Sequence, residues 1–250
     1  MYCSIGGMSS RILRVVPILA LAGASSLWAV PTLQLDILGG VYNTTTETTV
    51  ATSPSFTLRA LDMNGSSTSA PTATYFISAA IEPLLSSSSS VPNFGSVVIN
   101  GTTYSSTVNT SSWHWGSPPL NVPDSSSGTG PGNLASHGEF PTWYLELAFT
   151  FDNSHKVSAY NTADHTSALG SLWYHDFSVN VIGLLPQYTV HFDLYDEAVK
   201  KGVYTVDDFA PFSHDAESGG GGNQVPDSGA TLVLLGLSFV LLAVVRKKAV

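Results

Sequence analysis

Cysteine is almost missing from this sequence. Cys3 is the only one in 250 residues, so no disulfide can form within the chain. Charge is also scarce, because charged residues make up only 11% of the total. Five of the nine basic residues lie at the two ends, which leaves four between them against all 18 acidic residues. A body this acidic has no electrostatic footprint for nucleic acid, which we therefore exclude as a partner.

The motifs of the commonest enzyme classes are missing as well. The chain has no HExxH zinc motif, no G-x-S-x-G nucleophile elbow, no Walker loop and no Rossmann fingerprint. We therefore predict that the protein is not an enzyme and that it holds no resident cofactor.

What is present between residues 30 and 217 is a Ser/Thr-rich body with short runs of alternating apolar and polar residues. These runs are Leu33–Ile37, Ser55–Leu58, Tyr144–Phe151, Phe177–Val181 and Tyr188–Tyr195. Alternation with a period of two predicts strands that pack one face on a core and turn the other towards solvent. Two more apolar runs, Thr74–Ile81 and Gly95–Ile99, predict more deeply buried strands.

Turn-rich segments separate these runs, and Asn100-Gly101 is a typical two-residue hairpin turn. We predict an all-β body, an antiparallel β-sandwich of about eight or nine strands, with one short helix near Asp196–Lys201.

The two ends do not belong to this body. Arg11 and Arg14 precede the apolar run Val15–Ala29, a layout that predicts a secretory signal peptide over residues 1–29. A Gly-rich linker over residues 218–224 leads to a C-terminal segment, residues 225–250. Its apolar run, Ala230–Val245, would form a transmembrane helix about 24 Å long, slightly short of the ~30 Å hydrocarbon core.

A basic cluster closes the apolar run, formed by Arg246, Lys247 and Lys248. The positive-inside rule places such a cluster in the cytoplasm and the body outside.

Directly before the apolar run stands the motif Val225, Pro226, Asp227, Ser228 and Gly229. The motif, apolar helix and basic cluster together resemble the VPDSG variant of the PEP-CTERM sorting signals of Gram-negative bacteria. The resemblance implies export, passage through the inner membrane, processing by an exosortase, and delivery to the cell surface or extracellular matrix. The partners implied are signal peptidase, the export machinery and the exosortase. An internal echo of the motif, Val122–Ser126, lacks the apolar helix and is predicted to be a loop.

The body resembles the choice-of-anchor N family of exported bacterial proteins. The resemblance rests on LQLDILGGVYN, TETTVATSPSFTLRAL, LASHGEFPTWYLELAFTF, HFDLYD and FAPFSHDAES, which run from about Leu33 to Ser218. The family name carries no known activity, so the resemblance supports export and leaves the chemistry of the body open.

Several polar residues are candidates for binding. His191 and Asp193 are two apart on a predicted strand and project from one face. Asp193, Asp196, Asp207 and Asp208 offer hard oxygen ligands for Ca²⁺, with ordinary surface carboxylates as the alternative.

His137 and His214 each follow a serine and precede an acidic residue, which is Asp215 in the second case. They could bind zinc, act as acid and base, or tie down a loop. The four aromatic residues Trp113, Trp115, Trp143 and Trp173 could line a carbohydrate platform or pack in the core.

The sequence therefore predicts an exported, non-catalytic surface or extracellular-matrix protein. The first alternative is an adhesion module that binds Ca²⁺ or an exopolysaccharide, and the second is a secreted hydrolase that uses His137 or His214.

Overall fold

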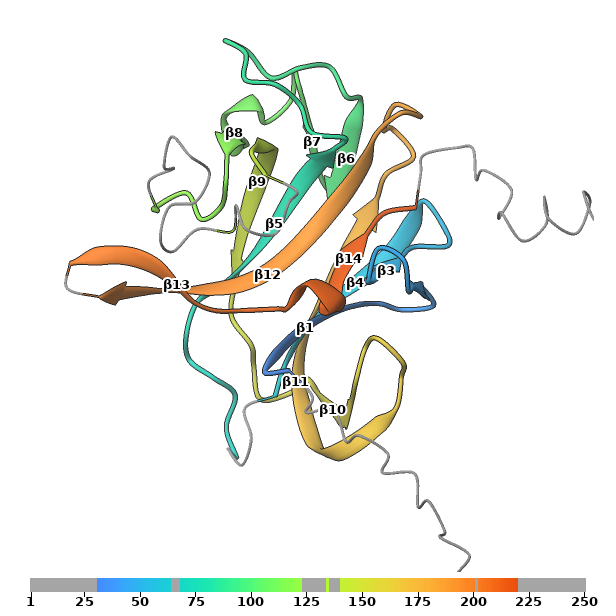
Figure 1. Ribbon diagram of the computed structural model, residues 1–250, viewed down its shortest axis with the longest axis vertical. Coiled ribbons are helices and arrows are strands. Elements are labelled where there is room, and N and C mark those ends of the chain that lie inside the picture. Colours follow the sequence, from blue (N-terminus) through green and yellow to red (C-terminus); the bar gives the residue numbers. More distant parts are fainter. Residues whose placement is uncertain (1–30, 64–67, 123–133, 135–139, 201, 220–250) are drawn as a thin grey trace, which may run out of the picture.

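The computed structural model describes residues 31–63, 68–122, 134, 140–200 and 202–219 of the chain (Figure 1). The predicted signal peptide and the sorting motif with its apolar run lie outside these residues. Within the described part of the chain, no helix is long and apolar enough to cross a membrane.

The described body is all-β and consists of two sheets (Figure 1). The six-stranded sheet contains β1 (Leu33–Ile37), β4 (Ser55–Asp62), β11 (Ser167–Asn180), β6 (Ser96–Ile99) and β7 (Thr102–Ser105) in that order, with β10 (Lys156–Tyr160) paired to β11. The eight-stranded sheet contains β2 (Val41–Asn43), β3 (Thr48–Val50), β14 (Asp215–Glu217), β12 (Thr189–Lys200), β5 (Tyr75–Glu82), β9 (Thr142–Phe149) and β8 (Trp113–Gly116), with β13 (Val203–Phe209) paired to β12. Two 3₁₀ turns complete the described elements, η1 (Thr110–Ser112) and η3 (Phe212–His214).

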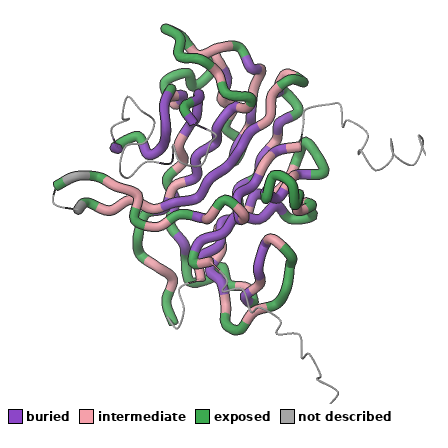
Figure 2. Tube along the Cα trace, viewed as in Figure 1, coloured by how far each residue is buried: buried purple, intermediate pink, exposed green. Residues whose placement is uncertain are grey.

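The main core lies where the apolar faces of the two sheets meet, and the buried strands run through the middle of the molecule in Figure 2. Alternate residues of each central strand point into it, such as Val190, Phe192 and Leu194 on β12. Phe56 of one sheet meets Phe192 of the other edge to face, with ring centroids 6.2 Å apart. Period-two alternation thus positions the core as the sequence predicts.

Two details of the predicted architecture are wrong. The strands number fourteen in the described residues, more than eight or nine, because short edge strands such as β2, β3 and β14 carry too little sequence pattern. The predicted helix at Asp196–Lys201 is wrong for its described residues: Asp196 to Lys200 continue β12, which pairs with β13 in an antiparallel hairpin. Pairing to a neighbouring strand overrides the local preference of this acidic, Lys-containing segment.

The predicted hairpin turn at Asn100-Gly101 is confirmed. It joins β6 to β7, with Ile99 opposite Thr102 in the register. Both turn residues have positive φ, 50° for Asn100 and 77° for Gly101, as a type I′ turn requires.

The outer faces of both sheets are covered in part, which changes the environment of their polar residues. On the six-stranded sheet, the end of β10 and the residues after it lie over β1, where Tyr160 donates a hydrogen bond to Asp36 and the backbone N–H of Thr162 donates one to Gln34. On the eight-stranded sheet, Leu134 and Phe140 pack on Ala80, Tyr144 and Tyr195, which lie on β5, β9 and β12. The prediction that alternate residues meet solvent is therefore wrong for Gln34 and Asp36, which are buried.

At Gly95, the backbone that leads into β6 passes very close to the backbone of Gly183 and Leu184, which connects β11 to β12. Gly95 forms a β-bridge with Leu184, and its backbone has a φ of +90°. A methyl group at this position would lie 2.2 Å from the carbonyl oxygen of Gly183. A side chain here is therefore excluded both by the backbone conformation and by the neighbouring backbone.

We expect Gly95→Ala to lower the free energy of unfolding by about 3 kcal/mol or more, because strain at positive φ and a backbone clash add up. Gly101→Ala is the matched control: its φ is also positive, at 77°, but nothing lies within 4 Å of the added methyl group. That control should cost only about 1–2 kcal/mol. Urea denaturation of both variants measures the difference, and equal losses would contradict the close approach at Gly95.

Candidate functional site

The outer face of the eight-stranded sheet carries a row of polar side chains contributed by three neighbouring strands. The register places His191 of β12 opposite Glu217 of β14 and opposite Ala80 of β5. Asp193 lies opposite Ser78 of β5, and continuing the β12–β14 register by one residue puts Asp215 opposite Asp193. Because side chains two residues apart share a face, His191, Asp193, Asp215 and Glu217 all project to the same side.

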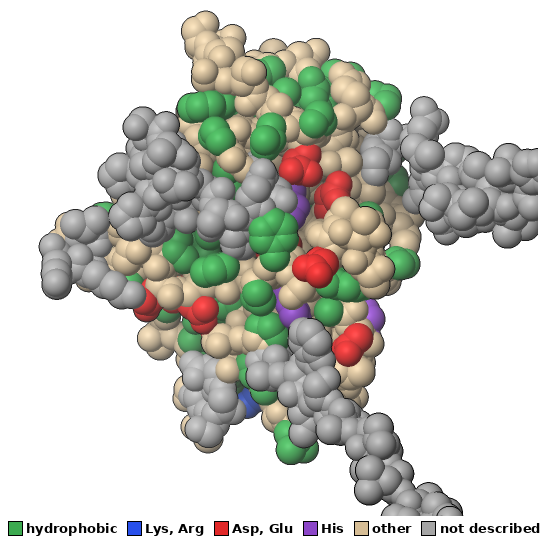
Figure 3. Space-filling model, in the orientation of Figure 1, with side chains coloured by type: hydrophobic (Ala, Val, Ile, Leu, Met, Phe, Trp, Pro, Cys, Tyr) green, Lys and Arg blue, Asp and Glu red, His purple; other side chains and the backbone are tan. Residues whose placement is uncertain are grey.

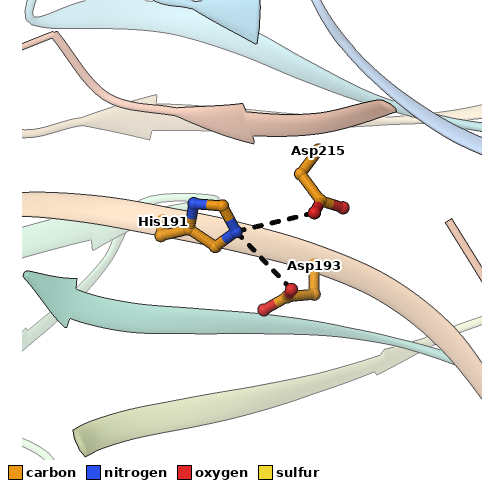
Figure 4. A group of neighbouring side chains, drawn as sticks. All are labelled: His191, Asp193 and Asp215. Carbon is orange, nitrogen blue, oxygen red and sulfur yellow. Dashed lines mark ion pairs between the residues drawn. The ribbon is translucent and has the colours of Figure 1, made fainter. Parts of the chain in front are cut away.

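Three of these side chains form a compact cluster (Figure 4). The His191 Nε2 atom lies 3.5 Å from Asp193 Oδ1 and 3.8 Å from Asp215 Oδ2. The side chains are almost fully buried, with exposed fractions of 4% for His191 and 1% for each aspartate. Ser78 fixes Asp193 from the other side, because its hydroxyl donates a 2.6 Å hydrogen bond to Asp193 Oδ2.

The electrostatics of the cluster favour a cation. Burial opposes the charged imidazolium, but the carboxylates of Asp193 and Asp215 outweigh it and raise the pKa of His191 well above its usual value. Burial, with the charges of Glu217 and Asp193, also raises the pKa of Glu82, which lies opposite Thr189 on the same face. In the view of Figure 3, acidic and histidine side chains gather near the middle while basic ones hardly appear.

His214 lies next to this cluster in sequence but has a different environment. Its Nε2 atom lies 3.0 Å from Asn161 Oδ1, and its Nδ1 atom lies 2.8 Å from the hydroxyl oxygen of Ser213. The ring is buried, and burial lowers its pKa to about 4. His214 thereby joins η3 to the segment that follows β10, and both of its ring nitrogens are used in doing so.

The four aspartates considered for Ca²⁺ do not converge. Asp193 belongs to the buried cluster, whereas Asp196 projects from the opposite face of β12. Asp196 accepts a 2.7 Å hydrogen bond from the backbone N–H of Asp208, which fixes the β12–β13 register. Asp207 is exposed on β13. Among the described residues, the one group of three or more potential ligands with close donor atoms is His191, Asp193 and Asp215.

The remaining candidates separate in the same way. His137 lies outside the described residues. Trp113, Trp143 and Trp173 are buried, and Trp115 is the exposed member of the set at 39%. Three of the four tryptophans therefore pack inside the body, although a hollow of about 430 Å³ beside Trp113 and Trp143 is lined with Ser and Thr hydroxyls.

Sequence reasoning identified His191 and Asp193 as neighbours on one face but did not join Asp215 to them. Their partner in the cluster comes from β14, a three-residue strand that follows a 3₁₀ turn. The sequence does contain a short alternating pattern here, because the polar residues Asp215 and Glu217 stand on either side of the apolar Ala216, which is buried. Ser78 was missed because it lies in a strand that reads as uniformly apolar.

The comparisons with known proteins bear on the C-terminal segment. The VPDSG-CTERM motif family matches residues 224–249. The C-terminal segment is thus similar to a PEP-CTERM-type sorting signal, as its motif, apolar run and basic cluster indicate. No curated protein and no solved structure matches the chain.

The low pKa of His214 leads to a prediction about acid stability. In the folded protein this ring resists protonation down to about pH 4, whereas in the unfolded chain it protonates near pH 6.5. Its contribution to stability is therefore full above pH 6.5 and is lost as the pH falls towards 4, by about 3 kcal/mol. Between pH 6.5 and pH 4, we expect the free energy of unfolding of His214→Gln to fall by about 3 kcal/mol less than that of the wild type.

Urea denaturation at a series of pH values measures this difference. His155→Gln is the control, because His155 is an exposed histidine whose side chain is 49% accessible. The control shows how far the loss of an exposed imidazole alone changes the stability. Parallel curves for His214→Gln and the wild type would show that His214 is not the group responsible.

Proposed function

We propose that this chain is an exported, non-catalytic protein of the bacterial cell surface or extracellular matrix, delivered by an exosortase. The observation that carries the proposal is the match of residues 224–249 to the VPDSG-CTERM motif. The motif is followed by an apolar run and then by Arg246, Lys247 and Lys248. An apolar helix holds a short preceding motif at the membrane face, where an intramembrane enzyme can reach it.

The N-terminal sequence supports the same route. Arg11 and Arg14 before the apolar run Val15–Ala29 provide the signal for export. The resemblance of the body to the choice-of-anchor N family stays a prediction. In that family a shared body is joined to different C-terminal anchors, which agrees with delivery of this body to the envelope.

The body offers support for a non-catalytic role. A general acid or base must reach its substrate with a free ring nitrogen. In the described part of the chain, His214 uses both ring nitrogens in internal contacts, and His191 is buried between two carboxylates. These two histidines thus serve the fold, whereas His137, the other residue of the hydrolase alternative, lies outside the described residues.

The adhesion-module alternative keeps one supporting observation. The hollow beside Trp113 and Trp143 combines aromatic rings with hydroxyl groups, and its lining residues are uncharged. This chemistry suits a neutral glycan better than Ca²⁺. Because both rings are buried, the surface available for stacking is small, and we rank this function second.

The sorting signal can be tested by one substitution and its internal control. Asp227→Ala alters the motif before the apolar run, whereas Asp124→Ala alters the echo Val122–Ser126, which has no apolar run behind it. We expect Asp227→Ala to reduce the processed fraction by roughly tenfold or more. A tenfold loss corresponds to about 1.4 kcal/mol of binding free energy between the motif and the exosortase. Asp124→Ala should be processed like the wild type.

Cell fractionation and mass spectrometry of the C-terminus in the native host measure both outcomes. Removal of residues 231–250 is a second variant, which should release the body unprocessed because the membrane-spanning run is gone. Equal processing of the Asp227 and Asp124 variants, or processing of the truncated chain, would contradict the proposal.

A further inference from the structure

We propose that His191, Asp193 and Asp215 form a binding site for one divalent first-row transition cation, such as Zn²⁺. The site joins two strands of the eight-stranded sheet, since His191 and Asp193 lie on β12 and Asp215 on β14. One donor atom from each residue lies within 4.8 Å of the other two (Figure 4).

The distances within the cluster favour shared ligation over direct hydrogen bonding. His191 Nε2 is 3.5 Å from Asp193 Oδ1 and 3.8 Å from Asp215 Oδ2, whereas an N–H···O hydrogen bond needs about 2.7–3.2 Å. Two ligands of a tetrahedral zinc ion, each about 2.1 Å from the metal, lie about 3.4 Å apart. The two distances from His191 Nε2 are therefore close to that of two atoms that coordinate one ion, and the whole set of three donor atoms lies within 4.8 Å.

The imidazole nitrogen supplies independent support. His191 Nε2 is buried, faces both carboxylates and makes no hydrogen bond within the described residues. A buried nitrogen in this position normally acquires a partner, because leaving it without one costs about 1–3 kcal/mol. A metal ion between Nε2 and the two carboxylate oxygens would supply that partner.

The balance of charge points the same way. A protonated His191 beside two ionised aspartates leaves the three-residue group with a net negative charge. A divalent cation bound by a neutral imidazole and two carboxylates brings the same group to neutrality, which lowers the cost of burying it. Glu82 and Glu217 lie on the same face of the sheet, opposite Thr189 and His191 in the register.

The donor set decides the class of cation. Imidazole suits zinc and other first-row transition metals, whereas Ca²⁺ and Mg²⁺ prefer all-oxygen sites with more ligands. Ser78 orients the site, because its hydroxyl holds Asp193 Oδ2 and turns Oδ1 towards His191. Three protein ligands leave the fourth position of a tetrahedral ion for another donor such as water. Because all three side chains are almost fully buried, a metal bound by them would stabilise the fold.

The test uses the full chain, solubilised in detergent, stripped with EDTA and then equilibrated with Zn²⁺ alone. We expect one tightly bound Zn²⁺ per chain by elemental analysis and a higher melting temperature with Zn²⁺ but not with the same concentration of Ca²⁺. His191→Gln should weaken Zn²⁺ binding by roughly a hundredfold or more. The matched control is His155→Gln, because His155 forms an exposed pair with Asp152 at 2.7 Å.

Retention of the bound Zn²⁺ by His155→Gln, together with its loss from His191→Gln, would support the site. A second measurement keeps the test independent of how well His191→Gln folds. X-ray absorption of the Zn²⁺-loaded wild-type protein should show one imidazole nitrogen and carboxylate oxygens around the metal. The proposal is overturned if the wild type binds no Zn²⁺, if His191→Gln binds it equally well, or if Ca²⁺ stabilises the protein as much as Zn²⁺.

Discussion

The structure depends on one constraint. Where other segments cover the outer face of a sheet, the polar side chains on that face must find their partners inside the protein. A buried polar group without a partner costs more than most single contacts contribute. In the part of the chain that the structure describes, tyrosine hydroxyls donate hydrogen bonds to carboxylates in the pairs Tyr75–Asp62, Tyr160–Asp36 and Tyr195–Glu146. Asp62 is buried, and burial raises the pKa of its carboxyl to about 6. In the cluster around His191, three side chains with exposed fractions of 4% or less lie together on one face of the sheet.

These internal contacts matter for a protein that we propose to be exported. Exported domains often use disulfides for stability, but a chain whose one cysteine is Cys3 cannot form one internally. The described body relies instead on a two-sheet core and on polar contacts that join distant strands. Asp62 and Tyr75, for example, connect β4 of one sheet to β5 of the other. A metal ion bound by His191, Asp193 and Asp215 would add a further link between β12 and β14.

The sequence predicts those features that depend on local pattern. Alternation locates β1, β9 and β12, and Asn100-Gly101 locates a hairpin, because each signal lies within a few residues. Features that depend on contacts between distant segments are not readable in this way. The burial of Asp36 requires the end of β10 to lie over β1, and the approach of Asp215 to His191 requires the register of a three-residue strand. The four acidic candidates for calcium look alike in sequence and differ only in the faces from which they project.

The most direct test of the central claim is a double-mutant cycle on His191→Gln and Asp215→Asn, measured by urea denaturation in the presence of a metal chelator. Each single substitution leaves a buried partner uncompensated and should cost about 3 kcal/mol or more. If the two groups stabilise each other across the β12–β14 ladder, the double variant loses less than the sum, with a coupling energy of at least about 1 kcal/mol. Losses that add within about 0.5 kcal/mol would show that the cluster is not held together by this interaction.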